Sequence, residues 1–204
     1  MSYSQNNEEN LIRQFFKGQT GRFIDIGAND GKTLSNTLWC AENGWNGVCV
    51  EPSKEAFIRL QKLHENTEVL CMNCGISNES GELVFFESGN HLNKNDIALL
   101  SSIKESELNR WVNTPNQFTQ TKGDFFTWLD FHRLIGLAPI YDLISIDAEG
   151  CDWDILQQID LTKAGCKMLI IETNGIENQK YIDYCAGYGM RLYAKNHENL
   201  IFVK

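Results

Sequence analysis

The sequence predicts an α/β fold built around a mostly parallel β-sheet, with helices on both faces. Short apolar runs rich in Val and Ile alternate with helix-like stretches, which is the pattern of βαβ units. Two of these runs, 143–146 and 168–171, are apolar at every position, as expected for strands that are covered on both sides. The 204 residues are enough for one domain, 1–204, with a core of its own.

The expected elements follow from hydrophobic periodicity and turn residues. Strands are expected at 22–26, 47–51, 68–73, 141–147, 167–173, 188–194 and 199–203. Helices are expected at 8–17, within an N-terminal segment 1–20, and at 33–43, 53–64, 152–158 and 178–187. The alternating segment 81–88 is expected to form an extra antiparallel strand or hairpin, and the last two strands a terminal hairpin.

The polar stretch from 88 to 126 breaks this alternation, although 101–111 has the composition of a helix. Long stretches of this kind are usually functional covers. We therefore expect 88–132 to be a lid or acceptor-side insertion. Trp111, Trp128 and Phe131 have spacings that suit its lining, but aromatic residues at helical spacing more often belong to the core. A tolerated surface insertion is the alternative.

Composition and charge exclude several classes of protein. With 42% hydrophobic residues the chain is not disordered, and its net charge of −9 argues against binding to nucleic acid. We expect no membrane span, because no run reaches the roughly 18 apolar residues required. The first residues show no secretory signal, and the seven cysteines do not suggest a disulfide framework, so we expect a cytoplasmic protein. The oligomeric state is left open.

The strongest local signal is the glycine turn that follows the first expected strand, in FIDIGANDGKT. Glycines at such a turn let the backbone approach a ligand closely. Gly27 and Gly31 are separated by three residues, one too few for a P-loop. A dinucleotide turn needs GxGxxG, and here Asn29 replaces the middle glycine.

S-adenosylmethionine is the ligand that suits this turn better, because it is cationic and carries no phosphate. Asp25 precedes the turn and Asp30 lies within it. Glu51 ends the second expected strand, 20 residues after Gly31, where an acid can accept hydrogen bonds from ribose hydroxyls. Together these residues predict a site for S-adenosylmethionine.

From about residue 22 to 175 the chain resembles the FkbM family of class I S-adenosylmethionine-dependent methyltransferases. The matching stretches are FIDIGANDGKTLSNTL, GVCVEPSKEAFIRL, MNCGISNESGELVFF, SSI, FTWLD, DLISIDAEGCDWDIL and LIIETNG. The resemblance implies a Rossmann-like sheet of seven strands whose last strand is antiparallel. It also implies O-methylation, commonly of a sugar or a natural-product hydroxyl.

The resemblance also implies roles for individual residues. Asp147 matches the acid beside the transferred methyl group, residues 73–76 edge the adenine, and Ser101 and Ser102 match a serine motif without an assigned role. With the turn residues, the set expected to bind the cofactor is Asp25, Gly27, Ala28, Asn29, Asp30, Gly31, Glu51, Pro52, Cys74, Gly75, Ile76 and Asp147.

Methyl transfer to a hydroxyl requires alignment of the reactants and a base. The expected catalytic residues are Asp147, Glu149 and Glu172, which follow or end strands at the edge of the sheet where ligands bind. His132 is a weaker candidate for the base. Asp147, Glu172 and Asn174 offer oxygen ligands for a divalent cation, which the sequence leaves open and does not favour.

We therefore expect an S-adenosylmethionine-dependent methyltransferase that acts on a hydroxyl of a small molecule or glycan. A non-catalytic Rossmann-like binding module is the first alternative, since a fold does not determine a function. An NAD-dependent reductase is the second, and the missing middle glycine argues against it. The sequence does not identify the methyl acceptor.

Overall fold

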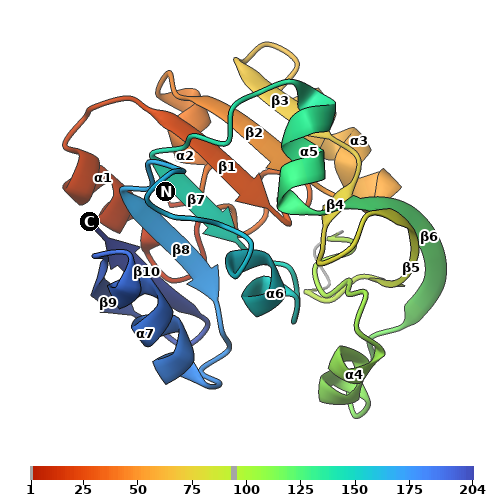
Figure 1. Ribbon diagram of the computed structural model, residues 1–204. Coiled ribbons are helices and arrows are strands. Elements are labelled where there is room, and N and C mark those ends of the chain that lie inside the picture. The colour runs from red at the N-terminus through yellow and green to blue at the C-terminus, as the bar shows by residue number, and fades with distance from the viewer. Residues whose placement is uncertain (1, 93–95) are drawn as a thin grey trace.

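A computed structural model describes residues 2–92 and 96–204, which form a seven-stranded sheet in the order β3-β2-β1-β7-β8-β10-β9 (Figure 1). The strands are β1 (Arg22–Ile26), β2 (Asn46–Val50), β3 (Val69–Met72), β7 (Leu143–Ile146), β8 (Met168–Glu172), β9 (Arg191–Lys195) and β10 (Asn199–Val203). The first five strands in this order are parallel, and β10 is antiparallel to both of its neighbours. The expected mostly parallel sheet with an antiparallel last strand is confirmed.

Helices cover both faces of this sheet, as expected. They are α1 (Glu8–Phe16), α2 (Leu38–Glu42) and α3 (Lys54–Leu63) on one face, and α5 (Trp128–Ile135), α6 (Asp152–Leu156) and α7 (Asn178–Gly187) on the other. Successive strand residues point to opposite faces. Phe23 of β1 therefore packs in the core beside α1–α3, whereas Ile24 packs in the core beside α5–α7.

A second sheet of three strands, in the order β4-β6-β5, lies beside the large one (Figure 1). Its strands are β4 (Gly75–Ile76), β5 (Gly81–Ser88) and β6 (Phe118–Phe126). The extra antiparallel strand expected at 81–88 is thus confirmed. Its partner β6 was not expected, because polar residues occupy most of its positions and most of the strand is exposed or half-buried. In the chain between β5 and β6, α4 (Glu105–Leu108) and a short 3-10 helix (Asn109–Trp111) occupy the segment with helical composition.

The helix expected at 33–43 is shorter in the structure, where α2 begins only at Leu38. Leu34 has a left-handed backbone with φ of 58° and pairs with Ser4 in an isolated bridge. A residue in this conformation does not fit into an α-helix. The residues before Leu38 therefore form an extended turn instead of the first helical turns.

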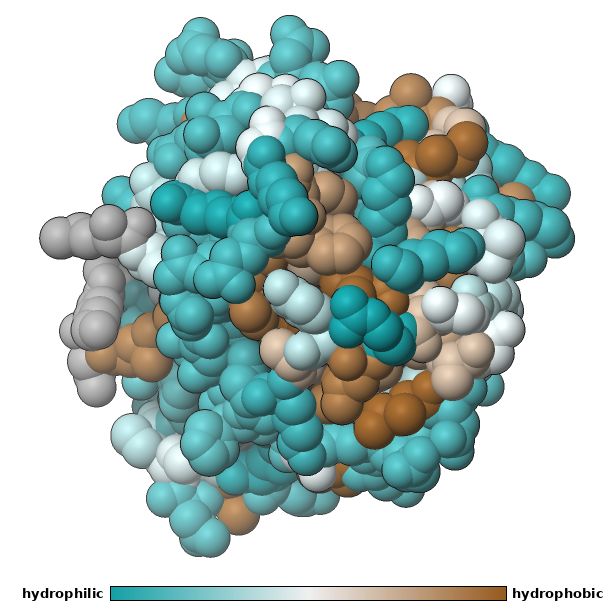
Figure 2. Space-filling model, turned by 90° about the vertical axis from the view of Figure 1, so that its left-hand side faces the viewer, coloured by the Kyte–Doolittle hydropathy of each residue, from teal (hydrophilic) through white to brown (hydrophobic). Residues whose placement is uncertain are grey.

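Apolar side chains are concentrated in the two cores between the large sheet and its helices. On the face of the molecule drawn in Figure 2, hydrophilic side chains predominate and the apolar ones form a broken patch between them. In the described ranges, no helix combines the length and the apolar composition that are needed to cross a lipid bilayer.

Candidate functional site

The candidate site lies where the strand order reverses, beyond the carboxyl ends of the neighbouring strands β1 and β7. Ligands bind at this switch point in open α/β sheets. A cavity of about 230 Å³ is found there. Its lining comes from the turn after β1, the ends of β2 and β8, the loop after β7, strand β4, and residues 98–103 of the connection between β5 and β6.

Gly27 brings the turn after β1 against the end of β7. Its φ is +85°, and a Cβ atom at this position would lie 1.7 Å from the Asp147 carbonyl oxygen. The main-chain N–H groups of Gly27 and Ala28 donate to the Val50 carbonyl oxygen at 3.0 and 3.1 Å. Only glycine fits here, because any side chain would collide with the backbone of the neighbouring strand.

Glu51 follows β2 and is held by backbone donors on both carboxylate oxygens. The N–H of Asn29 donates to Oε2 at 2.9 Å, and the N–H of Ser53 donates to Oε1 at 2.7 Å. The residue is buried, and this burial raises the pKa of Glu51 to about 8, although the two N–H groups counteract the shift. Each oxygen keeps a lone pair for a further donor.

Asp25 is a second buried acid with a fixed partner. The Thr37 hydroxyl donates to its Oδ2 at 2.6 Å. Burial raises the pKa of Asp25 to about 6, and hydrogen bonds from Thr37 and Ser145 act in the opposite direction. Thr37 precedes α2, so this bond also joins that helix to β1.

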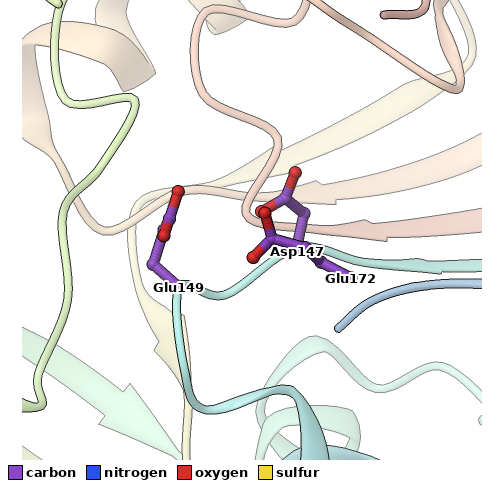
Figure 3. Close-up of side chains that lie close together, drawn as sticks. All are labelled: Asp147, Glu149 and Glu172. Carbon is purple, nitrogen blue, oxygen red and sulfur yellow. The ribbon is translucent and has the colours of Figure 1, made fainter. Parts of the chain in front are cut away.

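Asp147, Glu149 and Glu172 form a cluster of three carboxylates at the ends of β7 and β8 (Figure 3). One oxygen from each lies within 4.8 Å of the oxygens from the other two. Oε2 of Glu149 and Oε2 of Glu172 are buried and have no hydrogen-bond partner. We refer to these three residues as the carboxylate cluster.

The carboxylates of the cluster disfavour ionisation in one another. Burial raises the pKa of Asp147 to about 8, with smaller contributions from the nearby acids Asp152 and Asp25. Burial and then Asp147 raise the pKa of both Glu149 and Glu172. Arg110 forms an ion pair with the cluster, with its Nη1 3.7 Å from Oε2 of Glu149.

The loop that carries Glu149 is held by the connection between β5 and β6. The Ser102 hydroxyl donates to the Glu149 carbonyl oxygen at 2.6 Å, and Nζ of Lys104 donates to the Gly150 carbonyl oxygen at 2.7 Å. Glu149 itself has a left-handed backbone with φ of 43°. The serine motif singled out by the family resemblance therefore supports the loop of an acidic site residue.

Most residues expected to bind the cofactor or to act in catalysis do line the cavity. They are Asp25, Gly27, Ala28, Asn29, Glu51, Pro52, Gly75, Ile76, Asp147, Glu149 and Glu172. Asn174, considered as a cation ligand, lines it too, as does Trp111 of the expected lid.

Three expected cofactor residues do not line the cavity. The carboxylate of Asp30 instead accepts hydrogen bonds from the main-chain N–H groups of Lys32 and Thr33 and from the Thr33 hydroxyl. Gly31 faces α3, where a Cβ atom would lie 2.6 Å from Cδ1 of Leu60. Cys74 is buried in the core beside α5–α7.

The aromatic residues of α5 belong to the core, as their helical spacing favours. Trp128 and Phe131 are buried in the core instead of lining the cavity. His132 is also buried, with Nδ1 at 2.7 Å from the Trp128 carbonyl oxygen and Nε2 at 2.9 Å from the Tyr141 hydroxyl. Both ring nitrogens are therefore engaged inside the protein, which leaves His132 no proton to exchange with an acceptor.

Sequence reasoning also missed two residues of the site. Thr37, which bonds Asp25, lies 12 residues along the chain and has no distinguishing pattern around it. Arg110, which pairs with Glu149, lies in a polar segment whose fold the sequence does not reveal. Only the three-dimensional contact identifies either one.

The comparisons with known proteins agree with this architecture. The family model of the methyltransferase FkbM domain matches residues 25–192. A comparison with curated protein sequences finds no significant match.

Solved structures of methyltransferases share the fold at low sequence identity. A methyltransferase FkbM from Methylobacillus flagellatus KT has a TM-score of 0.54 and 12% identity, over 91% of this chain and 44% of that one, so this chain spans less than half of its length. A ribosomal protein L11 methylase from Lactobacillus delbrueckii subsp. bulgaricus has a TM-score of 0.52 and 9% identity, over 97% and 77% of the two chains. Magnesium protoporphyrin IX methyltransferase from Synechocystis PCC 6803, solved with bound SAM, has a TM-score of 0.50 and 9% identity, over 97% and 78%.

At this level of identity the solved structures establish the Rossmann-like class I methyltransferase fold. The family model covers most of the chain, from the acid of β1 to the start of β9. The chain therefore belongs to the FkbM family of methyltransferases.

Proposed function

We propose that the chain uses S-adenosylmethionine to methylate a hydroxyl of a small molecule or glycan, as one domain whose segment 88–132 contributes the acceptor side. The charge of the cavity is the observation that carries this proposal. Among the described residues that line it are six carboxylates and one arginine. Such a lining attracts a cation and repels phosphates, which disfavours NAD and favours a sulfonium cofactor.

The residues present fit this cofactor. Glu51, fixed by two backbone N–H groups, is placed to accept hydrogen bonds from ribose hydroxyls, as the acid after the second strand does in dinucleotide folds. Oδ1 of Asn29 is buried without a partner and offers an acceptor to an ammonium or hydroxyl group. Gly75 and Ile76 line the part of the cavity proposed for the adenine.

S-adenosylmethionine supplies an electrophilic methyl group when it is bound. The chain must then orient an acceptor hydroxyl and remove its proton. Asp147 and Glu149 are proposed for this step, because both line the cavity and burial raises the pKa of Asp147 to about 8, near the range of an effective base at neutral pH. Glu172 completes the cluster and disfavours charge on its neighbours.

The acceptor side also offers an aromatic surface. The guanidinium of Arg110 lies 5.5 Å from the ring centre of Trp111 and contacts Glu149, so the ring is close to the carboxylate cluster. An apolar surface beside a few convergent polar groups is typical of small-molecule sites. This arrangement supports an acceptor of the size of a sugar or a natural-product ring.

Isothermal titration calorimetry with S-adenosylhomocysteine tests the cofactor. We expect saturable binding that weakens about 10- to 100-fold in Glu51→Gln, because hydrogen bonds to a charged group contribute about 1.5–3 kcal/mol each. The exposed Glu68, which lies outside the cavity, gives a matched control as Glu68→Gln. Folded protein that does not bind S-adenosylhomocysteine, or binding unchanged in Glu51→Gln, would contradict the proposal.

Transfer is tested separately with methyl-labelled S-adenosylmethionine and a panel of sugars, glycans and hydroxylated natural products. Recovery of the labelled methyl group as a methyl ether of the acceptor would support O-methylation. A greater increase in melting temperature with NADH than with S-adenosylhomocysteine would favour the reductase alternative. Cofactor binding without transfer to any member of a wide panel would favour a non-catalytic module.

A further inference from the structure

We propose that the carboxylate cluster of Asp147, Glu149 and Glu172 binds one hard divalent cation, with Mg²⁺ and Mn²⁺ as its chemical class. Only the use that the enzyme makes of this cation rests on the proposed function. Binding of the cation itself depends on three side chains and the loops that position them.

The spacing of the three carboxylates fits a single cation. One oxygen from each residue lies within 4.8 Å of the other two. Oxygens that coordinate the same Mg²⁺ at about 2.0–2.1 Å are at most about 4.2 Å apart, so side-chain shifts of no more than about 0.6 Å would bring the three onto one ion. Asp147 and Glu149 come from the loop after β7 and Glu172 from the end of β8, so the donors are supplied by adjacent strand ends (Figure 3).

Two oxygens of the cluster have no hydrogen-bond partner. Glu149 is 8% exposed and Glu172 is 7% exposed, and Oε2 of each is buried without a hydrogen bond. Buried charged groups are normally paired or coordinate a metal, because desolvation without compensation is costly. Each of these oxygens therefore has a coordination position that the described protein groups do not fill.

The charge balance points the same way. With all three carboxylates ionised, as coordination of a metal requires, the cluster and the guanidinium of Arg110 carry a formal charge of −2. Arg110 lies at 3.7 Å from Glu149, too far for a hydrogen bond, so it neutralises the cluster only in part. One divalent cation would balance the remaining charge.

The donor set selects the kind of cation. It contains oxygen atoms and no histidine or cysteine, which suits Mg²⁺ or Mn²⁺ better than Zn²⁺ or Cu²⁺. The set differs from that considered from sequence, since Glu149 takes part in the cluster. Asn174 lines the same cavity and is available as a further oxygen donor.

Given the proposed function, a cation here would bind the acceptor hydroxyl and lower its pKa, so that the proton leaves more readily. The acceptor oxygen would then form its bond to the methyl carbon as the bond from carbon to sulfur breaks. A carboxylate of the cluster or water would receive the proton.

The test is a titration of the full chain with Mn²⁺ after treatment with a chelator, followed by electron paramagnetic resonance of free Mn²⁺. We expect one saturable site that Mg²⁺ displaces. Glu172→Gln and Glu149→Gln should each weaken binding at least about ten-fold, since each removes a charged ligand. Glu198→Gln is the matched control, because Glu198 lines the cavity but does not belong to the cluster, and its Mn²⁺ affinity should equal that of the wild type.

Thermal unfolding shows whether each variant is folded and gives a second measurement. Mn²⁺ should raise the melting temperature of the wild type and of Glu198→Gln, and this increase should be absent in both cluster variants. The proposal is overturned if folded wild-type protein binds no Mn²⁺ at millimolar concentration, or if the cluster variants bind it as the control does. Binding of S-adenosylhomocysteine is measured in the same samples, so the proposed function can fail while the cation site stands, and the reverse.

Discussion

The same cavity contains two groups of buried carboxylates that differ in how they are held. On the side of β1 and β2, Asp25 accepts from Thr37 and Glu51 accepts from two main-chain N–H groups. On the side of β7 and β8, Glu149 and Glu172 each keep a buried oxygen without a hydrogen bond. Hydrogen bonds offset part of the cost of burying charge in the first group, whereas one oxygen each of Glu149 and Glu172 lacks such a bond.

This difference suggests separate roles for the two sides of the cavity. A carboxylate fixed by the backbone keeps one orientation before a ligand arrives, and such preorganisation favours recognition of a cofactor. A carboxylate without a partner is unfavourable until a proton, a cation or a polar ligand compensates it. We therefore place cofactor recognition on the first side and the changing charges of the reaction on the second.

The largest expected effect is that of Gly27→Ala, because this residue joins the two sides. The new Cβ would lie 1.7 Å from the Asp147 carbonyl oxygen, so β1 and β7 would have to separate. We expect a loss of at least about 3 kcal/mol in the free energy of unfolding, from overpacking together with backbone strain. Urea denaturation measures it.

Gly18→Ala is the control for this change. Gly18 has a similar φ of +80°, but a Cβ atom there would meet nothing within 4 Å. It should lose only about 1–2 kcal/mol, the cost of a left-handed backbone. Equal losses in the two variants would mean that the close contact between β1 and β7 is unimportant.

One nearly isosteric substitution on each side of the cavity is expected to change the free energy of unfolding in opposite directions. Thr37→Val removes the donor to Asp25 and should lower the free energy of unfolding at pH 8 by about 1.5–3 kcal/mol, because a buried charge loses its hydrogen bond. Glu172→Gln removes a buried charge whose Oε2 has no hydrogen bond and should raise the free energy of unfolding by about 1 kcal/mol, because the neutral side chain avoids the desolvation cost of that charge. Both are measured by denaturation in the presence of a chelator and without cofactor.

The increase in the free energy of unfolding that Glu172→Gln produces should depend on pH. Burial raises the pKa of Glu172 in the folded protein above its value in the unfolded chain, so the folded state binds a proton more tightly. The wild type therefore loses stability as the pH rises from about 4.5 towards the folded pKa. The advantage of the variant should be small at pH 5 and larger at pH 8. A gain that is the same at both values would contradict the assigned cause.

Elements that depend on the local sequence pattern could be predicted, whereas those that depend on contacts between distant segments could not. The strands β7 and β8 were predictable because continuous apolar runs indicate burial on both faces, and the acids Asp147 and Glu172 stand at the ends of those runs. Strand β6 was not, since its residues are mostly polar and its pairing with β5 joins distant segments. Arg110 and Thr37 depend on the same kind of long-range contact.

Within the site, the residue types were informative but the directions of their side chains were not. The acidic residues of GANDG and IDAEG were predictable as a group from their positions after strands. Whether a given acid faces the cavity or its own turn depends on local hydrogen bonds, as Asp30 and Glu51 show. The partnerless oxygens of Glu149 and Glu172 depend on packing and have no counterpart in the sequence.

The smallest effect is expected for Asp30→Asn, and it separates the sequence prediction from the structure. If the charge of Asp30 attracted a cationic cofactor, the neutral side chain would weaken S-adenosylhomocysteine binding about ten-fold or more, as loss of a charged partner does. The structure instead engages this carboxylate with Thr33 and Lys32, and asparagine keeps an oxygen for the N–H of Thr33, at 2.7 Å in the wild type. We expect affinity within about two-fold and a stability loss below about 1 kcal/mol, the usual range for a neutral hydrogen bond. Calorimetry beside Glu51→Gln measures the contrast, and a comparable loss in the two variants would place Asp30 among the residues that recognise the cofactor.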